Sequence, residues 1–212
     1  MPIDIVLPRL NSYNISLSDA FKYPFKTPNR LIYALLVLIP ILGWLVLFGY
    51  MVRLINEFIE GRYEGLIKLD IIEDLKLGFI TFLKALPFYI VYAIVVSAAT
   101  YVSATLGSLV NLLLAFFVIP ILAVNFFRKQ TIESFFEFDV LNVVKDNLGD
   151  YVVTVLKQYV LSIVFLILSI VLIGIPALLF TNSIFIANFY GRYIEQKHIL
   201  ALKTQSKDPL TV

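Results

Sequence analysis

The sequence contains no cysteine, one histidine and little charge. Only 15% of its 212 residues are charged, while 60% are hydrophobic. Without cysteine the chain has no disulfide, no thiolate nucleophile and no cysteine-based metal site. A metal site usually needs several converging ligands, and a single histidine, His198, does not supply them. A soluble domain averages about 25% charged residues, so this composition excludes disorder and indicates an integral membrane protein.

The patterns typical of enzymes and cofactor-binding proteins are also missing. No glycine-rich phosphate or dinucleotide fingerprint occurs. The serines and threonines of the apolar segments have no acid or histidine nearby in the sequence to activate them. A net charge of +2 is too small to indicate nucleic-acid binding. We therefore expect no catalytic residue, no cofactor, no bound metal and no nucleic-acid partner.

Three long stretches contain no charged residue, namely 31–52, 85–127 and 158–191. A helix that crosses a bilayer needs about 20 apolar residues, so the first stretch allows one crossing and the others two each. Turn residues at 103–108 and at Ile173–Pro176 divide the longer stretches. The sequence predicts an all-α integral membrane helical bundle with about five spanning helices. The predicted crossings are 31–51, 85–104, 108–127, 152–172 and 176–194.

Charged segments with helical periodicity lie between these stretches. In the segment 64–80, Ile71, Leu75 and Phe79 fall on one face of a helix, opposite acidic residues, and 131–147 has the same kind of pattern. Both are predicted as amphipathic helices in the membrane interface or against the bundle. The chain then divides into three parts: an N-terminal tail and interfacial foot (1–30), a transmembrane domain (31–196) and a C-terminal tail (197–212).

A short internal repeat accompanies this order. The segment Leu38–Leu42 is echoed by Val118–Leu122, and the segment Thr81–Lys84 by Thr154–Lys157. The pattern indicates a possible tandem repeat of span, surface helix and span. Chance similarity between short apolar segments is the alternative.

Basic residues are distributed unequally between the two sides of the predicted bundle. The turns at 103–108 and 173–176 contain no lysine or arginine, whereas the opposite loops and the tail contain thirteen. By the positive-inside rule the charged loops and the C-terminus are cytoplasmic in a cell membrane. A single kinked crossing over 31–51 would leave the basic N-terminal segment outside. The alternative is a re-entrant hairpin at Pro40 and Gly43, which would keep that segment inside.

Two sets of side chains are candidates for contacts with ligands. Basic residues on the charged side are possible contacts for anionic lipids, although orientation alone also explains their position. They are Arg53, Arg62, Arg128, Lys129, Arg192 and Lys197. Asparagines near membrane depth either line a path for a neutral solute or bond between helices, and the second role is the commoner one. They are Asn111, Asn125, Asn182 and Asn188.

Several short motifs resemble those of a known family. They are Asp19–Phe25, Leu38–Gly43, Gly49–Arg53, Asp74–Gly78, Phe138–Val140 and Phe189–Arg192. Together they make residues 17–195 similar to the DUF4013 family of prokaryotic polytopic membrane proteins. One departure is that Leu66–Asp70 lacks the proline that the family often has after its first charged loop. The resemblance implies a polytopic membrane protein of unknown function and carries over no catalytic residues.

These observations lead to one predicted function and one alternative. The absence of ionisable groups in the apolar stretches, and the shortness of the polar ones, predict a protein that is not an enzyme. We expect a scaffold, assembly or accessory subunit that contacts membrane lipids and either other subunits or further copies of itself. The alternative is a channel or carrier for a small neutral or lipidic substrate. That alternative predicts a polar cavity lined by the asparagines named above.

Overall fold

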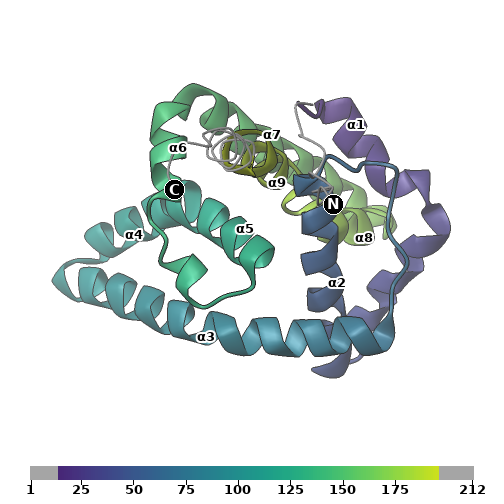
Figure 1. The fold of residues 1–212 in the computed structure, drawn as a ribbon, viewed down its shortest axis with the longest axis horizontal. Coiled ribbons are helices and arrows are strands. Elements are labelled where there is room, and N and C mark those ends of the chain that lie inside the picture. The colour runs from purple at the N-terminus through teal and green to yellow at the C-terminus, as the bar shows by residue number, and fades with distance from the viewer. Residues whose placement is uncertain (1–13, 196–212) are drawn as a thin grey trace, which may run out of the picture.

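A computed structural model describes residues 14–195, and every regular element in that part of the chain is a helix (Figure 1). The longer helices are α2 (Leu42–Ile59), α3 (Ile71–Val102), α4 (Ala104–Leu113), α5 (Ile119–Lys129) and α7 (Leu148–Leu168). Shorter ones are α1 (Leu17–Lys22), α6 (Val140–Asp146), α8 (Gly174–Thr181) and α9 (Ile184–Tyr190). The 3₁₀ helices are η1 (Tyr23–Lys26), η2 (Pro28–Leu38), η4 (Glu133–Phe135) and η5 (Ser169–Val171). The π-helices are η3 (Leu114–Val118) and η6 (Gly191–Glu195).

Four helices of the described chain are long and apolar enough to cross a membrane. They are Leu42–Ile59, Ile71–Val102, Ala104–Lys129 and Leu148–Leu168. The third joins α4, η3 and α5 into one continuous helix. The predicted all-α membrane bundle is thereby confirmed, and the two places where its helices differ from the expected five lie at the first and last crossings.

The first predicted crossing is a helical hairpin in place of one kinked helix over 31–51. The chain reverses at Pro40 and Ile41, because proline forces extended backbone on the residue before it and Ile41 adopts a positive φ of 64°. The indole of Trp44 donates a hydrogen bond of 2.8 Å to the carbonyl of Val37 across the turn. A Cβ on Gly43 would lie 2.0 Å from the carbonyl oxygen of Leu36, so only glycine allows this approach. The reversal corresponds to the hairpin alternative.

The last predicted crossing, 176–194, is divided into α8 and α9 at Asn182 and Ser183. Gln158 of α7 bridges the break: its amide donates to the carbonyl of Thr181 at 3.0 Å and accepts from the Phe185 N–H at 3.2 Å. These bonds replace part of the helical ladder that the break interrupts. Neither α8 nor α9 is long enough to cross a membrane alone.

The centre of the molecule is built around α2 and α9. All seven residues of α9 are buried, and they pack against α2, α5 and α7. Helix α3 crosses α2 at very short range, since a Cβ on Gly78 would lie 1.9 Å from the Leu45 carbonyl oxygen. A second glycine, Gly49, faces Asp74 of α3 at the same crossing. Small residues at a helix crossing let the two backbones come close, as in other membrane bundles.

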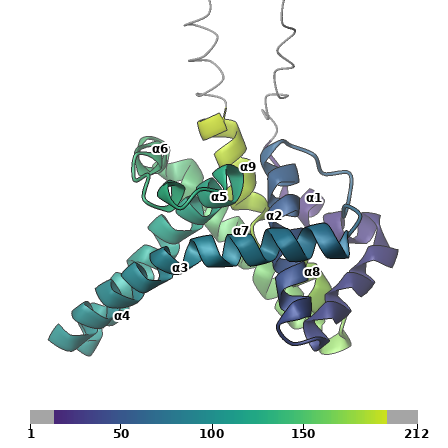
Figure 2. The same cartoon turned by 60° about the horizontal axis from the view of Figure 1, so that its bottom comes forward.

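The far half of α3 leaves this centre together with α4. Figure 2 shows the two helices projecting side by side, and we call residues 86–113 the arm. A single residue, Ser103, turns the chain between them, so the predicted turn over 103–108 is shorter than expected. The hydroxyl of Ser103 accepts from the Leu106 N–H at 3.0 Å and caps α4 immediately.

The predicted amphipathic helices differ in their bounds from 64–80 and 131–147. Residues 65–70 form no helix, because Asp70 caps the start of α3 by accepting from the N–H groups of Ile72 and Glu73. Helix α3 then runs on without a break into the arm. In the second segment only η4 and α6 form, since Gln130 ends α5 in the left-handed conformation.

The two copies of the sequence repeat have different local structures. Leu38–Leu42 contains the turn of the η2–α2 hairpin. Val118–Leu122 is helical, and Pro120 lies inside the continuous helix directly after η3, a π-helical segment that interrupts the regular hydrogen-bond ladder where proline cannot donate. The two similar sequences therefore form a chain reversal in one place and a continuing helix in the other.

The described part of the predicted interfacial foot packs on the bundle. Tyr23 is fully buried and its hydroxyl donates to the Gly65 carbonyl at 3.0 Å. Phe21 stacks on Phe165 of α7 with ring centroids 5.4 Å apart. Burial raises the pKa of the Tyr23 phenol well above its usual range. Residues 1–13 of the foot lie outside the described residues.

Candidate functional site: a charged face and an uncharged cavity

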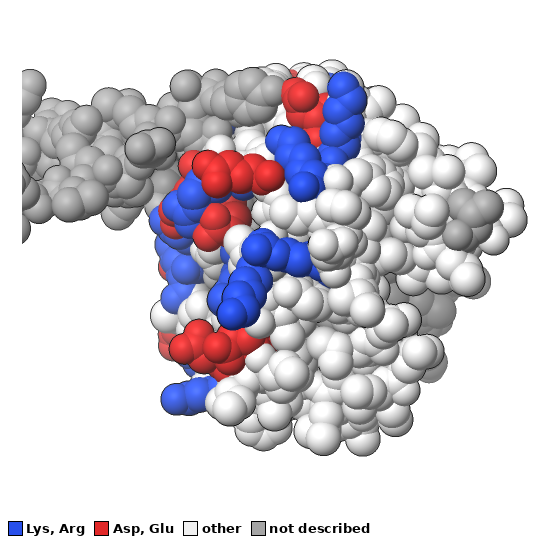
Figure 3. Space-filling view, turned by 90° about the vertical axis from the view of Figure 1, so that its right-hand side faces the viewer, with Lys and Arg blue, Asp and Glu red and all other residues white. Residues whose placement is uncertain are grey.

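Charged side chains gather along one edge of the molecule, and Figure 3 shows the rest of that view almost free of them. The loops that follow α2 and α5 both contribute to this charged face. The η2–α2 turn and the tip of the arm lie at the opposite side, at the bottom of Figure 2. The molecule therefore has one charged side and one side of apolar turns, as the distribution of basic residues predicts.

Each described member of the predicted lipid-contact set has a carboxylate partner. Arg53 binds buried Asp74 through two bonds, of 2.7 and 2.9 Å. Arg128 pairs with Glu60 at 2.9 Å. The remaining pairs are Arg62 with Glu57 and Glu60, Lys129 with Glu137, and Arg192 with Asp150. Lys197 lies outside the described residues. The cations are held by the protein itself, which leaves less of their charge for a lipid phosphate.

These ion pairs shift the pKa values of several side chains on the charged face. Burial works against ionisation of Glu60, but hydrogen bonds from Arg128 and Arg62 outweigh it and lower the pKa of that carboxyl. Hydrogen bonds from Lys129 and Asn125 lower the pKa of Glu137. The hydrogen bond to Glu57 raises the pKa of the Arg62 guanidinium. All three shifts favour the charged forms, so the ion pairs persist at neutral pH.

Two of the four predicted asparagines belong to a buried network under the charged face. Asn125 accepts from the Tyr190 hydroxyl at 2.8 Å and donates to the Ser134 carbonyl at 2.7 Å. Asn188 donates to the Tyr63 hydroxyl at 2.9 Å and accepts from Arg192 at 3.1 Å. Both side chains are fully buried and bonded between elements, which is the interhelical role.

The other two asparagines lie far from that network. Asn111 accepts a hydrogen bond from Tyr92 and joins the two helices of the arm. Asn182 lies at the α8–α9 break and lines a cavity of about 390 Å³. The four asparagines therefore form no single path, and one of them meets the expectation of a polar lining.

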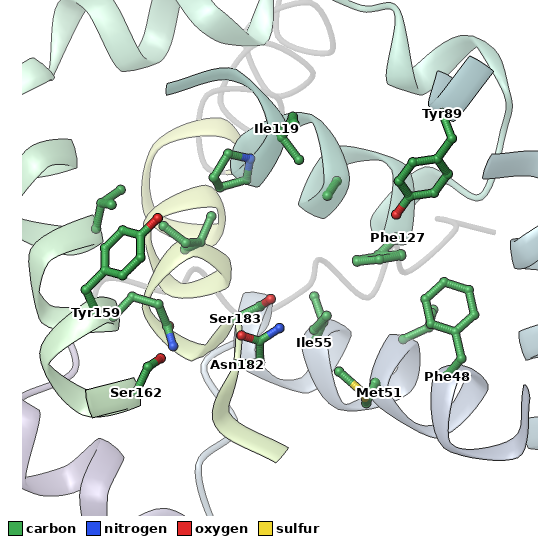
Figure 4. A pocket seen from close by; sticks show the side chains of 16 residues that line it. Phe48, Met51, Ile55, Tyr89, Ile119, Phe127, Tyr159, Ser162, Asn182 and Ser183 are labelled. Carbon is green, nitrogen blue, oxygen red and sulfur yellow. The ribbon is translucent and has the colours of Figure 1, made fainter. Parts of the chain in front are cut away.

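The cavity lies between α2, α3, α5, α7 and the α8–α9 break (Figure 4). Ser162, Asn182 and Ser183 form a polar end, and Phe48, Tyr89 and Phe127 form an aromatic end across from it. None of the described residues that line it is charged. Its volume falls within the ~300–1,000 Å³ range of ligand pockets, which also combine an apolar lining with a few polar groups.

Sequence reasoning missed most of this cavity. Gln158, which bridges the helix break, begins the third charge-free stretch and is a polar side chain close to membrane depth. That signal could have indicated a break in the facing helix, because a buried amide needs partners. The position of Tyr89 in the cavity lining has no such signal, since it depends on how α3 crosses α2.

The four apolar helices, with an uncharged cavity between them, indicate a helical membrane protein. The chain belongs to the DUF4013 family, which is described as a protein of unknown function, and the family model matches residues 32–176. The resemblance seen in the sequence is thereby confirmed. No curated protein and no solved structure matches the chain.

Proposed function

We propose that this protein is a non-enzymatic structural subunit of a membrane assembly, either a complex with other proteins or a homo-oligomer. The observation that supports this most strongly is the arm. Every buried residue of α3 lies at or before Phe88, and the only buried residue of α4 is Gly107. The arm therefore presents apolar side chains on nearly all sides. Its exposed large residues include Tyr89, Ile90, Ile94, Tyr101, Val102, Leu109 and Leu112.

The placement we propose is a cell membrane with the charged face in the cytoplasm. The basic residues of the loops support it through the positive-inside rule. The η2–α2 hairpin adds support, since Lys26 and Arg30 donate to the carbonyls of Tyr63 and Leu66 and so lie at the same side as the charged loops. The paired arginines make orientation, more than lipid capture, the role of this face.

The test is site-specific crosslinking in native membranes. A photo-crosslinking amino acid at Leu112, on the arm, is compared with one at Ile163, an equally apolar and exposed position on α7. We expect a protein-sized adduct from Leu112 and only lipid adducts from Ile163. Mass spectrometry of the adduct distinguishes another protein from a second copy. Lipid adducts alone at both positions would contradict the proposal.

A second candidate function is a channel or carrier for a small neutral or lipidic substrate. The helix break at Asn182 and the cavity beside it support this alternative, because broken helices at mid-depth are a recurrent feature of transporters. Saturable flux of a neutral solute into liposomes that contain the purified protein would favour it over the structural role.

A further inference from the structure

We propose that the cavity between α2, α3, α5 and α7 is a binding site for an uncharged amphiphile of about a dozen non-hydrogen atoms, with one hydrogen-bonding group. The inference goes beyond a structural role and requires no transport. It starts from the depth of the site. Eight residues, or about 12 Å of helix, separate the α8–α9 break from the turn at Gly174, and ten residues, or about 15 Å, separate it from Arg192. Asn182 and Ser183 therefore lie near the middle of the last apolar segment, and we place them near the middle of the membrane.

The polar end of the cavity has unused hydrogen-bonding capacity. The side chains of Ser162, Asn182 and Ser183 make no hydrogen bond to any residue within 14–195. Figure 4 shows Asn182 and Ser183 beside each other at the cavity wall. Lipid tails offer these groups no partner at this depth, so a bound hydroxyl or amide would satisfy them. Gln158, by contrast, donates one hydrogen bond and accepts one at the helix break.

The aromatic end of the cavity indicates the chemical character of the rest of the ligand. Phe48, Met51, Tyr89 and Phe127 present rings and a thioether, which suit a flexible hydrocarbon. No described lining residue has a charge that could compensate an ionic ligand, and an unpaired ion at this depth is strongly unfavourable. The ligand is therefore neutral, apolar over most of its length and polar at one end.

The volume of the cavity fits a ligand with one short hydrocarbon chain. A volume of about 390 Å³ holds about 13 non-hydrogen atoms at the ~30 Å³ that each water occupies in the liquid. A two-chain phospholipid is several times larger. A fatty alcohol of twelve carbons has 13 such atoms and the required single hydroxyl, so 1-dodecanol is a suitable probe of this ligand class.

The experiment uses the full chain in phosphatidylcholine nanodiscs with a photoactivatable dodecanol that carries a mid-chain diazirine. Mass spectrometry maps the labelled peptides. We expect saturable labelling of cavity residues such as Ile55, Ala123 and Val155, which 1-dodecanol displaces. At equal mole fraction in the disc, dodecane, which lacks the hydroxyl, should compete about tenfold less well, which is the order of one neutral hydrogen bond. Dodecyl phosphate, whose charge would be unpaired at this depth, should compete less well still. Equal competition by dodecane, or labelling spread evenly over the arm, would overturn the proposal.

Three variants make the test specific. Ala123→Phe fills the cavity and should reduce labelling about tenfold or more. Ala93→Phe, which makes the same change at an exposed arm position, should leave labelling unchanged. Asn182→Leu should keep the labelling but remove the preference for dodecanol over dodecane. Matching elution profiles and unfolding temperatures show that each variant is folded. Undiminished labelling of a folded Ala123→Phe variant would refute the site.

Discussion

The body of the molecule and its arm are both built from apolar helices but differ in what surrounds their side chains. Within the most apolar window of α2, 56% of residues are buried by protein, against 17% in that of α3. Apolar helices thus form a closed core in one region and an open surface in the other. Hydropathy identifies which helices suit a membrane, and the position of small and polar residues decides which of them the protein itself covers.

The stabilising contacts of the two regions differ in kind. The body has the glycine crossing of α2 and α3, the ion pair of Arg53 with buried Asp74, and the asparagine network around α9. The arm has a packed hairpin tip at Gly107, the cap at Ser103 and the bond of Tyr92 to Asn111. We therefore expect the arm to depend on its environment much more than the body does.

The largest expected effect comes from removing a core ring in the body. Phe58 is buried and contacts the rings of Tyr23 and Tyr63 at centroid distances of 5.0 and 5.8 Å. Phe58→Ala should lower the free energy of unfolding by about 4 kcal/mol, through lost transfer energy and the cavity left behind. Leu112→Ala on the arm should cost less than about 1 kcal/mol, because that side chain touches little protein. Equilibrium unfolding in mixed micelles measures both.

Similar losses at the two positions would break the distinction between body and arm. In that event the arm would contribute to the same cooperative unit as α2 and α9. A Leu112→Ala effect that appears only in native membranes, and not in micelles, would indicate a partner that covers the arm.

The next effect concerns the crossing of α2 and α3. In Gly78→Ala the new Cβ meets the Leu45 backbone oxygen at 1.9 Å, so the two helices must move apart. We expect a loss of about 3 kcal/mol, at the upper end of overpacking effects. The matched control is Gly149→Ala in α7, where nothing lies within 4 Å and alanine should be neutral or slightly stabilising. Unchanged stability of Gly78→Ala would show that the crossing is looser than the structure has it.

The comparison also explains which features the sequence predicted. The all-α membrane bundle follows from the apolar stretches and the helical periodicity, and it is confirmed. The hairpin at Pro40 was predicted only as an alternative, because a proline in an apolar stretch fits both a kink and a reversal. What decides is the contact between Gly43 and Leu36, which a linear pattern does not reveal.

The candidate site was less predictable than the fold. Asn182 was singled out with three other asparagines, and residue type alone could not separate it from Asn125 and Asn188, which are internally bonded. The predicted set of lipid-contacting cations stays a prediction, and the sequence alone does not reveal that its described members have carboxylate partners. Carboxylates that neutralise Arg53 and Arg128 lie 21 and 68 residues away in the chain, and only tertiary structure brings them together.

A smaller expected effect concerns the local stability of the arm at the start of α4. Ser103→Ala removes the cap of α4 and should destabilise its first turn by about 1 kcal/mol. Hydrogen exchange at residues 104–107 should then become about fivefold faster, while α9 keeps its protection. Ser97→Ala is the control, since that exposed serine of α3 caps no helix. Faster exchange in α9 as well would mean that the tip of the arm is coupled to the body.

The smallest effect is a response to acid that only the body should show. Because the pKa values of Glu60 and Glu137 are lowered by folding, their contribution is complete above the unfolded value of about 4.3 and is lost as pH falls below it. Each partly exposed pair is worth about 0.5 kcal/mol, so the unfolding temperature should fall slightly between pH 7 and pH 3.5. The double variant Glu60→Gln and Glu137→Gln should flatten this dependence. The arm contains no charged residue, so hydrogen exchange there, after correction for the intrinsic effect of pH, should stay constant over the same range. An arm that opens in acid would show that the ion pairs of the charged face also hold the arm in place.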